Sequence, residues 1–240
     1  MKRLIKLGLI GLFGSVLLSG CAILRADFEE DRIGGRPATQ PAGSPNDRII
    51  FSSISGGVLV VGSPFSFSGR VTSSDGQRSL EVSRNASVAF SSEAIPSARR
   101  FSRHRVSMLL NDGTARGITV SLLSGSAELA RVRFDEETVT ITGGSMPEAE
   151  DVVFDARTTG SSMRLNFTVD PSRGETRVAV QSSSRTLSGV YVFGDPREQE
   201  LTGLQLNVRL DNGGQFPRGR LIVDDVKGTW SPRLRFGTPR

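Results

Sequence analysis

The chain has 240 residues, with 30 Lys or Arg and 25 Asp or Glu side chains and a formal net charge of +5. It contains one cysteine, Cys21, and one histidine, His104. A single cysteine excludes an intrachain disulfide, and this pair of residues excludes a zinc site built from several cysteine and histidine ligands. Stability must therefore come from a hydrophobic core, for which a chain of this length is sufficient.

The N-terminal residues 1–20 are typical of an export signal. A basic start is followed by an apolar run over 7–18 that is too short to span a bilayer. The run leads into residues 18–21, which resemble the lipobox of bacterial lipoproteins. This resemblance implies cleavage before Cys21 and attachment of lipid to its sulfur, so the first expected partner is a membrane. Ala22 after the cysteine implies an outer-membrane location in the cell envelope.

Removal of the signal peptide changes the charge balance. Residues 1–20 hold three of the basic side chains and none of the acidic ones, so the formal charge of the remaining chain falls to +2. Binding of a nucleic acid requires a dense basic surface that neutralises several phosphates. We therefore expect no nucleic-acid partner.

The segment after the cysteine reads as a tether. Residues 21–46 are mostly polar and contain Pro37, Pro41 and Pro45, a composition that is typical of a flexible linker. We expect a lipidated N-terminus and linker over 21–46 and a single domain over 47–240.

Beyond the linker, apolar and polar side chains alternate. Residues 163–169 and 204–210 place an apolar side chain at every second position, which is typical of strands with one buried face. Turn sequences rich in Asn, Asp and Gly separate such segments, as at 111–113, and no segment shows helical periodicity. The pattern predicts an all-β fold, a closed antiparallel β-sandwich.

Three fragments of the chain lie near its start, at one third of its length and near its end, at residues 27–29, 76–83 and 221–226. In this order they resemble the opening, second and closing strands of the galactose-binding-like jelly rolls, a family that includes many carbohydrate-binding modules. The resemblance implies a jelly-roll domain with a carbohydrate ligand. It also implies a structural calcium ion (Ca2+) between the chain ends, since calcium binds several oxygen ligands. The matching acidic residues are Glu29, Asp224 and Asp225. The alternative is that these acids are solvated charges on a linker and an edge strand.

The sequence departs from the family in its aromatic residues. Many such modules stack sugar rings on Trp or Tyr, but this chain has only Trp230 and Tyr191. Trp230 lies beside the closing strand, where we expect it to pack against the edge of the sandwich.

The residue types present limit the catalytic sites that the chain could form. His104 must serve any Ser-His-acid triad, yet it shares a strand face with Val106, Met108 and Leu110, at the margin of the core. Two groups of acids could supply the carboxylate pair of a glycoside hydrolase, at 135–137 and at 148–151. We expect that the protein is not an enzyme. The catalytic alternative that remains is a glycoside hydrolase.

Arginine recurs at positions that the alternation directs outward. Cross-strand arginines would form a basic face that binds carboxylates or phosphates of an anionic envelope or extracellular glycan. The alternative is a solvated face whose arginine stems cover apolar surface. The second functional hypothesis is a structural or assembly lipoprotein that binds another envelope protein. The candidate ligand-binding residues are Arg103, Arg105, Arg131, Arg133 and Arg164.

Overall fold

The structure, a computed structural model, describes the strands of the chain and several of the turns between them. The described residues are 21–26, 28–29, 32–34, 57–61, 69–74, 76–82, 87–92, 94–95, 97, 100, 102–112, 117–135, 138–142, 152–155, 162–182, 186–192, 201–210 and 221–231. The expected signal peptide, residues 1–20, and residues 35–46 of the expected linker lie outside them. Within the described part of the chain there is no apolar helix of membrane-spanning length.

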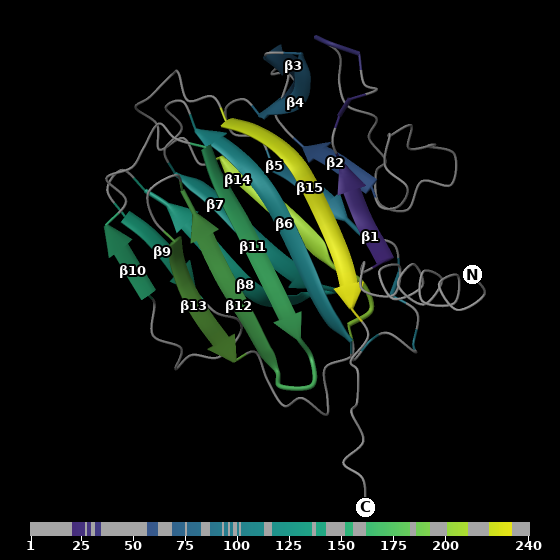
Figure 1. Ribbon diagram of the computed structural model, residues 1–240, viewed down its shortest axis with the longest axis vertical. Coiled ribbons are helices and arrows are strands. Elements are labelled where there is room, and N and C mark those ends of the chain that lie inside the picture. The colour runs from purple at the N-terminus through teal and green to yellow at the C-terminus, as the bar shows by residue number, and fades with distance from the viewer. Residues whose placement is uncertain are drawn as a thin grey trace, which may run out of the picture.

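Fifteen described strands form two antiparallel sheets that pack face to face (Figure 1). Sheet A contains β1 (Cys21–Ala26), β3 (Gly69–Ser74), β4 (Gln77–Val82), β6 (Arg103–Asp112), β11 (Ser162–Asp170), β12 (Glu175–Gln181), β13 (Thr186–Val192) and β15 (Leu221–Ser231). Sheet B contains β2 (Gly57–Val61), β5 (Ser87–Ser91), β7 (Ile118–Ser124), β8 (Ala127–Phe134), β9 (Thr138–Thr142), β10 (Val152–Asp155) and β14 (Gln205–Leu210). The order in sheet A is β13-β12-β11-β6-β15-β4-β3, with β1 also beside β15, and in sheet B it is β10-β9-β8-β7-β14-β5-β2.

Burial follows the alternation of the sequence. In β11, the side chains of Met163, Leu165, Phe167 and Val169 are buried, while the three residues between them are half-buried. The inward side chains of both sheets form one hydrophobic cluster. The expected all-β antiparallel sandwich is confirmed.

His104 lies on the inner face of sheet A. Its side chain is 0% exposed, and its backbone pairs with Trp230 in β15 and Val169 in β11. The expected position on the core face is confirmed. Burial of this kind keeps the imidazole away from any substrate on the outer surface.

The first strand differs from the expectation of a flexible linker. β1 begins at Cys21 itself and pairs with the second half of β15, from Cys21 opposite Trp230 to Ala26 opposite Val226. Leu24, Ala26 and the following Phe28 are buried. The Phe28 ring meets that of Phe90 in sheet B edge to face, with centroids 6.4 Å apart. Apolar burial therefore holds this segment in the sandwich, although its neighbours in sequence are polar.

A β-bulge in β15 divides the strand between two partners. The first part, Leu221–Val223, pairs with β4, and the part after the bulge pairs with β1. The register against β6 shifts between Asp224 and Lys227, and Asp225 takes a left-handed conformation with φ 48°. An extra residue of this kind sharpens the twist of a strand and redirects its side chains. In this structure the redirected side chain is that of Asp225.

Candidate functional site

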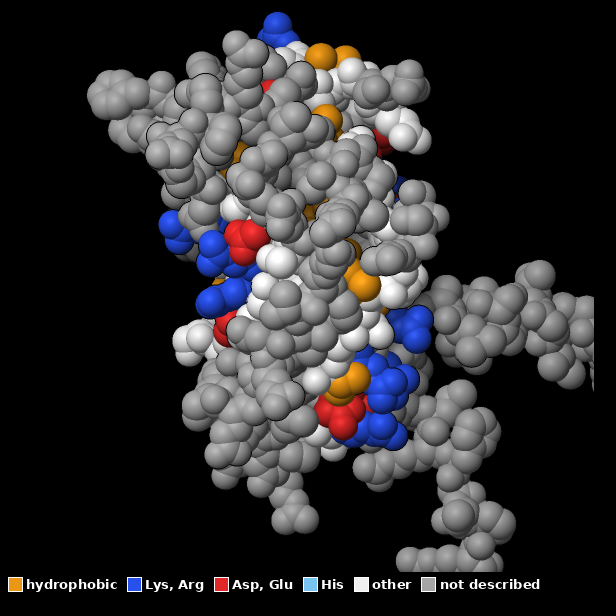
Figure 2. All heavy atoms as spheres, turned by 90° about the vertical axis from the view of Figure 1, so that its left-hand side faces the viewer, with side chains coloured by type: hydrophobic (Ala, Val, Ile, Leu, Met, Phe, Trp, Pro, Cys, Tyr) orange, Lys and Arg blue, Asp and Glu red, His pale blue; other side chains and the backbone are white. Residues whose placement is uncertain are grey.

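The five candidate arginines do not share one face. Arg103, Arg105 and Arg164 lie on β6 and β11 of sheet A, whereas Arg131 and Arg133 lie on β8 of sheet B. The expected single basic face is therefore wrong. The alternation shows which side chains point away from the core, but it does not show which sheet each strand joins. Figure 2 accordingly shows Lys and Arg side chains in separate groups on opposite sides of the molecule, each beside acidic side chains.

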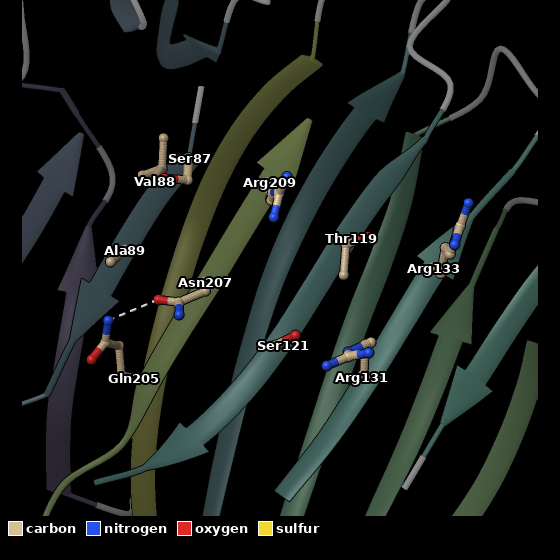
Figure 3. Close-up of a pocket in the computed structure, with 10 residues that line it drawn as sticks. All are labelled: Ser87, Val88, Ala89, Thr119, Ser121, Arg131, Arg133, Gln205, Asn207 and Arg209. Carbon is tan, nitrogen blue, oxygen red and sulfur yellow. Dashed lines mark hydrogen bonds between the residues drawn. The ribbon is translucent and has the colours of Figure 1, made fainter. Parts of the chain in front are cut away.

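The first group belongs to a hollow on the outer face of sheet B, here called the sheet B groove (Figure 3). Its volume is about 520 Å³. It crosses four neighbouring strands, β5, β14, β7 and β8. Its lining is formed by Ser87, Val88, Ala89, Thr119, Ser121, Arg131, Arg133, Gln205, Asn207 and Arg209.

Strand register arranges the groove in two cross-strand rows. One row runs from Ala89 through Asn207 and Ser121 to Arg131. The second row consists of Ser87, Arg209, Thr119 and Arg133. Neighbouring strands are about 4.8 Å apart, so each row presents a side chain at that interval over about 15 Å. Both rows end at an arginine of β8.

Acidic residues position the two arginines of β8. Arg131 donates from Nε and Nη2 to Glu128 Oε2, at 3.1 and 2.8 Å, and Arg133 Nε donates to Asp135 Oδ1 at 3.0 Å. The guanidinium-bearing side chains stay 48% and 60% exposed. Since a guanidinium has five N–H donors, each retains donors that can bind a ligand in the groove.

A side-chain amide pair lies at the other side of the groove. Gln205 Nε2 donates to Asn207 Oδ1 at 2.8 Å, as the dashed line in Figure 3 shows. Amide side chains both donate and accept hydrogen bonds, which is the property required to bind hydroxyl groups. Neither amide is among the candidate residues predicted from the sequence, although their polar positions in the alternation of 204–210 could have indicated them.

The second group lines a smaller hollow of about 350 Å³ on the outer face of sheet A, here called the sheet A pocket. Its lining is formed by Arg103, Arg105, Thr168, Asp170, Arg173, Glu175 and Arg177. Arg105 in β6 and Arg177 in β12 are both opposite Thr168, which lies between them in β11. Neither arginine forms an ion pair with another residue of the described part of the chain.

A buried carboxylate organises the floor of the sheet A pocket. The Asp170 side chain is only 7% exposed and accepts hydrogen bonds from Arg103 Nη2 at 3.1 Å and Ser172 Oγ at 2.7 Å. Arg173 Nε lies 4.0 Å from the same carboxylate. Asp170 and Arg173 are not among the candidates predicted from the sequence, because their proximity to β6 depends on where the turn after β11 meets that strand.

Arg164 belongs to neither hollow. Its Nη1 donates to Asp225 Oδ2 at 2.9 Å, and Lys227 pairs with the other oxygen of that carboxylate. Burial raises the pKa of Asp225, but the hydrogen bonds and positive charges of Lys227 and Arg164 outweigh it, so the pKa lies below its usual value. Arg164 thus binds a carboxylate of its own chain.

The three expected calcium ligands have other partners. Glu29 Oε1 accepts from the backbone N–H of Arg78 at 3.1 Å, and Asp224 Oδ1 accepts from the backbone N–H of Asp225 at 2.7 Å. Among the described residues, no three His, Cys, Asp or Glu side chains gather as metal ligands. The calcium ion stays a prediction.

Few of the residues on which the hydrolase alternative depends lie within the described part of the chain. Of the two acidic groups considered for glycoside hydrolysis, only Asp135 lies within the described residues, and it pairs with Arg133. Trp230 is partly buried against the core. The large hydrophobic side chains that the described surface exposes are Ile33 and Val190, each 54% exposed, and they lie on separate parts of the chain. The described residues thus form no broad apolar patch for a protein partner.

No protein-family model matches the chain, and no curated protein sequence does. Solved structures share the fold at low sequence identity. The CBM2 module of the evolved Dit of Lactobacillus casei BL23 phage J-1 aligns with a TM-score of 0.54 and 10% identity over 87% of this chain and 95% of its own. Lectin I-B4 from Griffonia simplicifolia aligns with a TM-score of 0.51 and 8% identity over 73% and 93%. The Lotus tetragonolobus seed lectin aligns with a TM-score of 0.52 and 12% identity over 72% and 93%. These likenesses identify a lectin-like jelly-roll sandwich.

Proposed function

We propose that this chain is a non-catalytic binding module that holds an anionic glycan in the sheet B groove. One observation carries the proposal: two rows of side chains, polar except for Ala89, cross four strands and end at Arg131 and Arg133. Hydroxyl and amide side chains can exchange hydrogen bonds with sugar hydroxyls in both directions. Arginine binds a carboxylate or sulfate through a planar pair of donors.

The fold supports the same proposal. The structural neighbours named above are lectins and a CBM2 module, and they share the two-sheet architecture. Function resides in the site and not in the fold, so this support depends on the polar lining of the groove. The hollow of about 520 Å³ has room for part of a polysaccharide.

The chemistry of the groove implies how it binds. Its described lining contains no aromatic side chain, so hydrogen bonds and charge must provide the affinity in place of ring stacking. Interactions between exposed charges are screened as salt rises. Binding is therefore expected to weaken steeply with ionic strength.

The test compares polygalacturonate with its methyl ester, because esterification removes the charge and leaves the sugar ring in place. The parent chain should be retained on polygalacturonate at low salt and released as salt rises. The triple variant Arg131→Gln, Arg133→Gln, Arg209→Gln should lose retention. The matched control, Arg103→Gln, Arg105→Gln, Arg177→Gln, carries the same change in charge outside the groove and should be retained like the parent. Equal loss in both variants at unchanged melting temperature, or no retention of the parent, would overturn the proposal.

The proposed context is a lipid anchor at Cys21 in the outer membrane of the cell envelope. Residues 18–21 with their lipobox pattern support it, as does the first described strand, which begins at Cys21. The full chain should incorporate labelled palmitate in a lipoprotein-producing bacterium and partition with membranes. The Cys21→Ser chain should incorporate none. Labelling of the Cys21→Ser chain would show that lipid is attached elsewhere.

A further inference from the structure

Several strand ends meet at the end of sheet A where β1 begins. β15 and β11 end there and β6 and β12 start there, and β1 starts beside the arrowhead of β15 (Figure 1). Cross-strand pairing connects Cys21 to Trp230, then to His104, Val169 and Thr176. The sheet A pocket lies along the same line. Arg103 and Arg105 flank His104 in β6, and Arg177 follows Thr176 in β12. Cys21 is two strands from β6, or about 10 Å.

We propose that the sheet A pocket binds the phosphate groups of lipids in the membrane that holds this chain. The inference rests on the proposed anchor at Cys21. Since β1 begins at Cys21 itself, no linker separates a lipid on that residue from the folded domain. The end of sheet A must then lie at the headgroup layer. The β6 side of the pocket lies about one Debye length from the anchor, and its β12 side, four strands from β1, lies about 20 Å away.

The charges of the pocket fit a phosphate. Four arginines and two acids line it, so positive charge is in excess by two. Asp170 is buried and forms ion pairs with two of these arginines. Its Oδ2 lies 3.1 Å from Arg103 Nη2 and 4.0 Å from Arg173 Nε. Arg105 and Arg177 are exposed, form no ion pair within the described residues, and flank the hydroxyl of Thr168. A phosphate between them would accept charge-assisted hydrogen bonds from both guanidinium groups.

The pocket differs from the sheet B groove in the ligand that it suits. It has no side-chain amide, and its single hydroxyl side chain lies between arginines. The groove offers amides and hydroxyls on β5, β14 and β7, which suits a sugar chain. A compact cationic hollow beside a lipid anchor suits a phosphate headgroup, and juxtamembrane arginines are attracted to anionic lipid surfaces.

The experiment measures cosedimentation of the chain from residue 21 onward, carrying Cys21→Ser, with lipid vesicles. This chain contains every described strand and has no acyl group, so its result is independent of palmitate labelling. Vesicles of phosphatidylcholine alone are compared with vesicles that also contain phosphatidylglycerol. We expect binding to the anionic vesicles that falls as salt rises. The triple variant Arg103→Gln, Arg105→Gln, Arg177→Gln should bind at least about ten-fold more weakly.

The matched control is the triple variant of the groove, Arg131→Gln, Arg133→Gln, Arg209→Gln, which should bind the vesicles like the parent. The two triple variants thus separate this proposal from glycan binding, because each is the control of the other. Equal losses in both, or equal binding to both kinds of vesicle, would overturn it. Inorganic phosphate provides the last arm: it should release the chain from the anionic vesicles at concentrations where chloride of equal ionic strength does not, and equal release by the two salts would contradict a phosphate site. Binding of inorganic phosphate by a chain that does not cosediment with the anionic vesicles would show that the pocket binds soluble phosphate and that the membrane assignment is wrong.

Discussion

The guanidinium of Arg164 in β11 reaches across β6 to the carboxylate of Asp225 in β15, with Nη1 and Oδ2 2.9 Å apart. The two side chains come from the centre of sheet A and from the bulge that lets β15 change partners. Lys227 binds the same carboxylate. An ionised Asp225 is therefore part of the structure that joins β1 and β4 to the rest of the sheet.

The pH dependence of stability follows from this cluster. Because the pKa of Asp225 is lowered on folding, its contribution to stability is present above the ordinary carboxyl value of 3.8 and is lost as the pH falls through the lower folded value. Asp225→Asn should lower the free energy of unfolding by up to about 1 kcal/mol at pH 7 and by less near pH 3. Denaturant titrations over that pH range measure the difference. A difference that is constant or grows on acidification would contradict the lowered pKa.

Gly228 allows β1 to lie close to β15. A Cβ atom at this position would be 3.0 Å from Leu24 Cβ and 3.2 Å from Ile23 Cγ1. Gly228→Ala should therefore displace β1 and lower the free energy of unfolding by about 1 to 3 kcal/mol. It should also speed amide hydrogen exchange in Cys21–Ala26.

The control is Gly203→Ala, whose added Cβ would lie 3.8 Å from Ser92 Oγ, an ordinary van der Waals contact. Its effect on stability should stay within about 0.5 kcal/mol. Equal effects of the two substitutions, with unchanged exchange in β1, would show that the close approach at Gly228 does not constrain the strand.

Phe28 tests whether the segment after β1 belongs to the core. Its side chain is 0% exposed and packs on Phe90 of the other sheet. Phe28→Ala should cost about 3 to 5 kcal/mol of unfolding free energy, as for other buried aromatic residues. Ile33→Ala, at a residue that is 54% exposed, should change it by less than about 0.5 kcal/mol. If chemical denaturation found the two variants alike, a flexible linker over 21–46 would be the better description.

The predicted calcium site has its own test. A ligand that binds only the folded state raises the melting temperature by mass action. Calcium should therefore raise the melting temperature of chelator-treated protein, and Glu29→Gln should abolish the rise, while Glu128→Gln in sheet B should preserve it. Identical melting curves with calcium and with chelator would remove the site.

The sequence by itself determined the strands that show clear alternation, such as β11 and β14, and the sides of them that face the core. The alternation in 163–169 and 204–210 is a local property, since neighbouring side chains of a strand point in opposite directions whatever the strand pairs with. For the same reason His104 could be assigned to the core face from its neighbours alone.

Only the tertiary structure decided which outward residues lie together. Arg105 and Arg131 have the same outward alternation, yet they lie on opposite faces because β6 and β8 join different sheets. β1 becomes a strand only through residues 226–230, about two hundred positions away, and its own polar surroundings favour a linker. Strand pairing depends on contacts between segments that are distant in sequence, whereas alternation depends on adjacent residues. The faces and pockets of this protein therefore arise from pairing that no local pattern encodes.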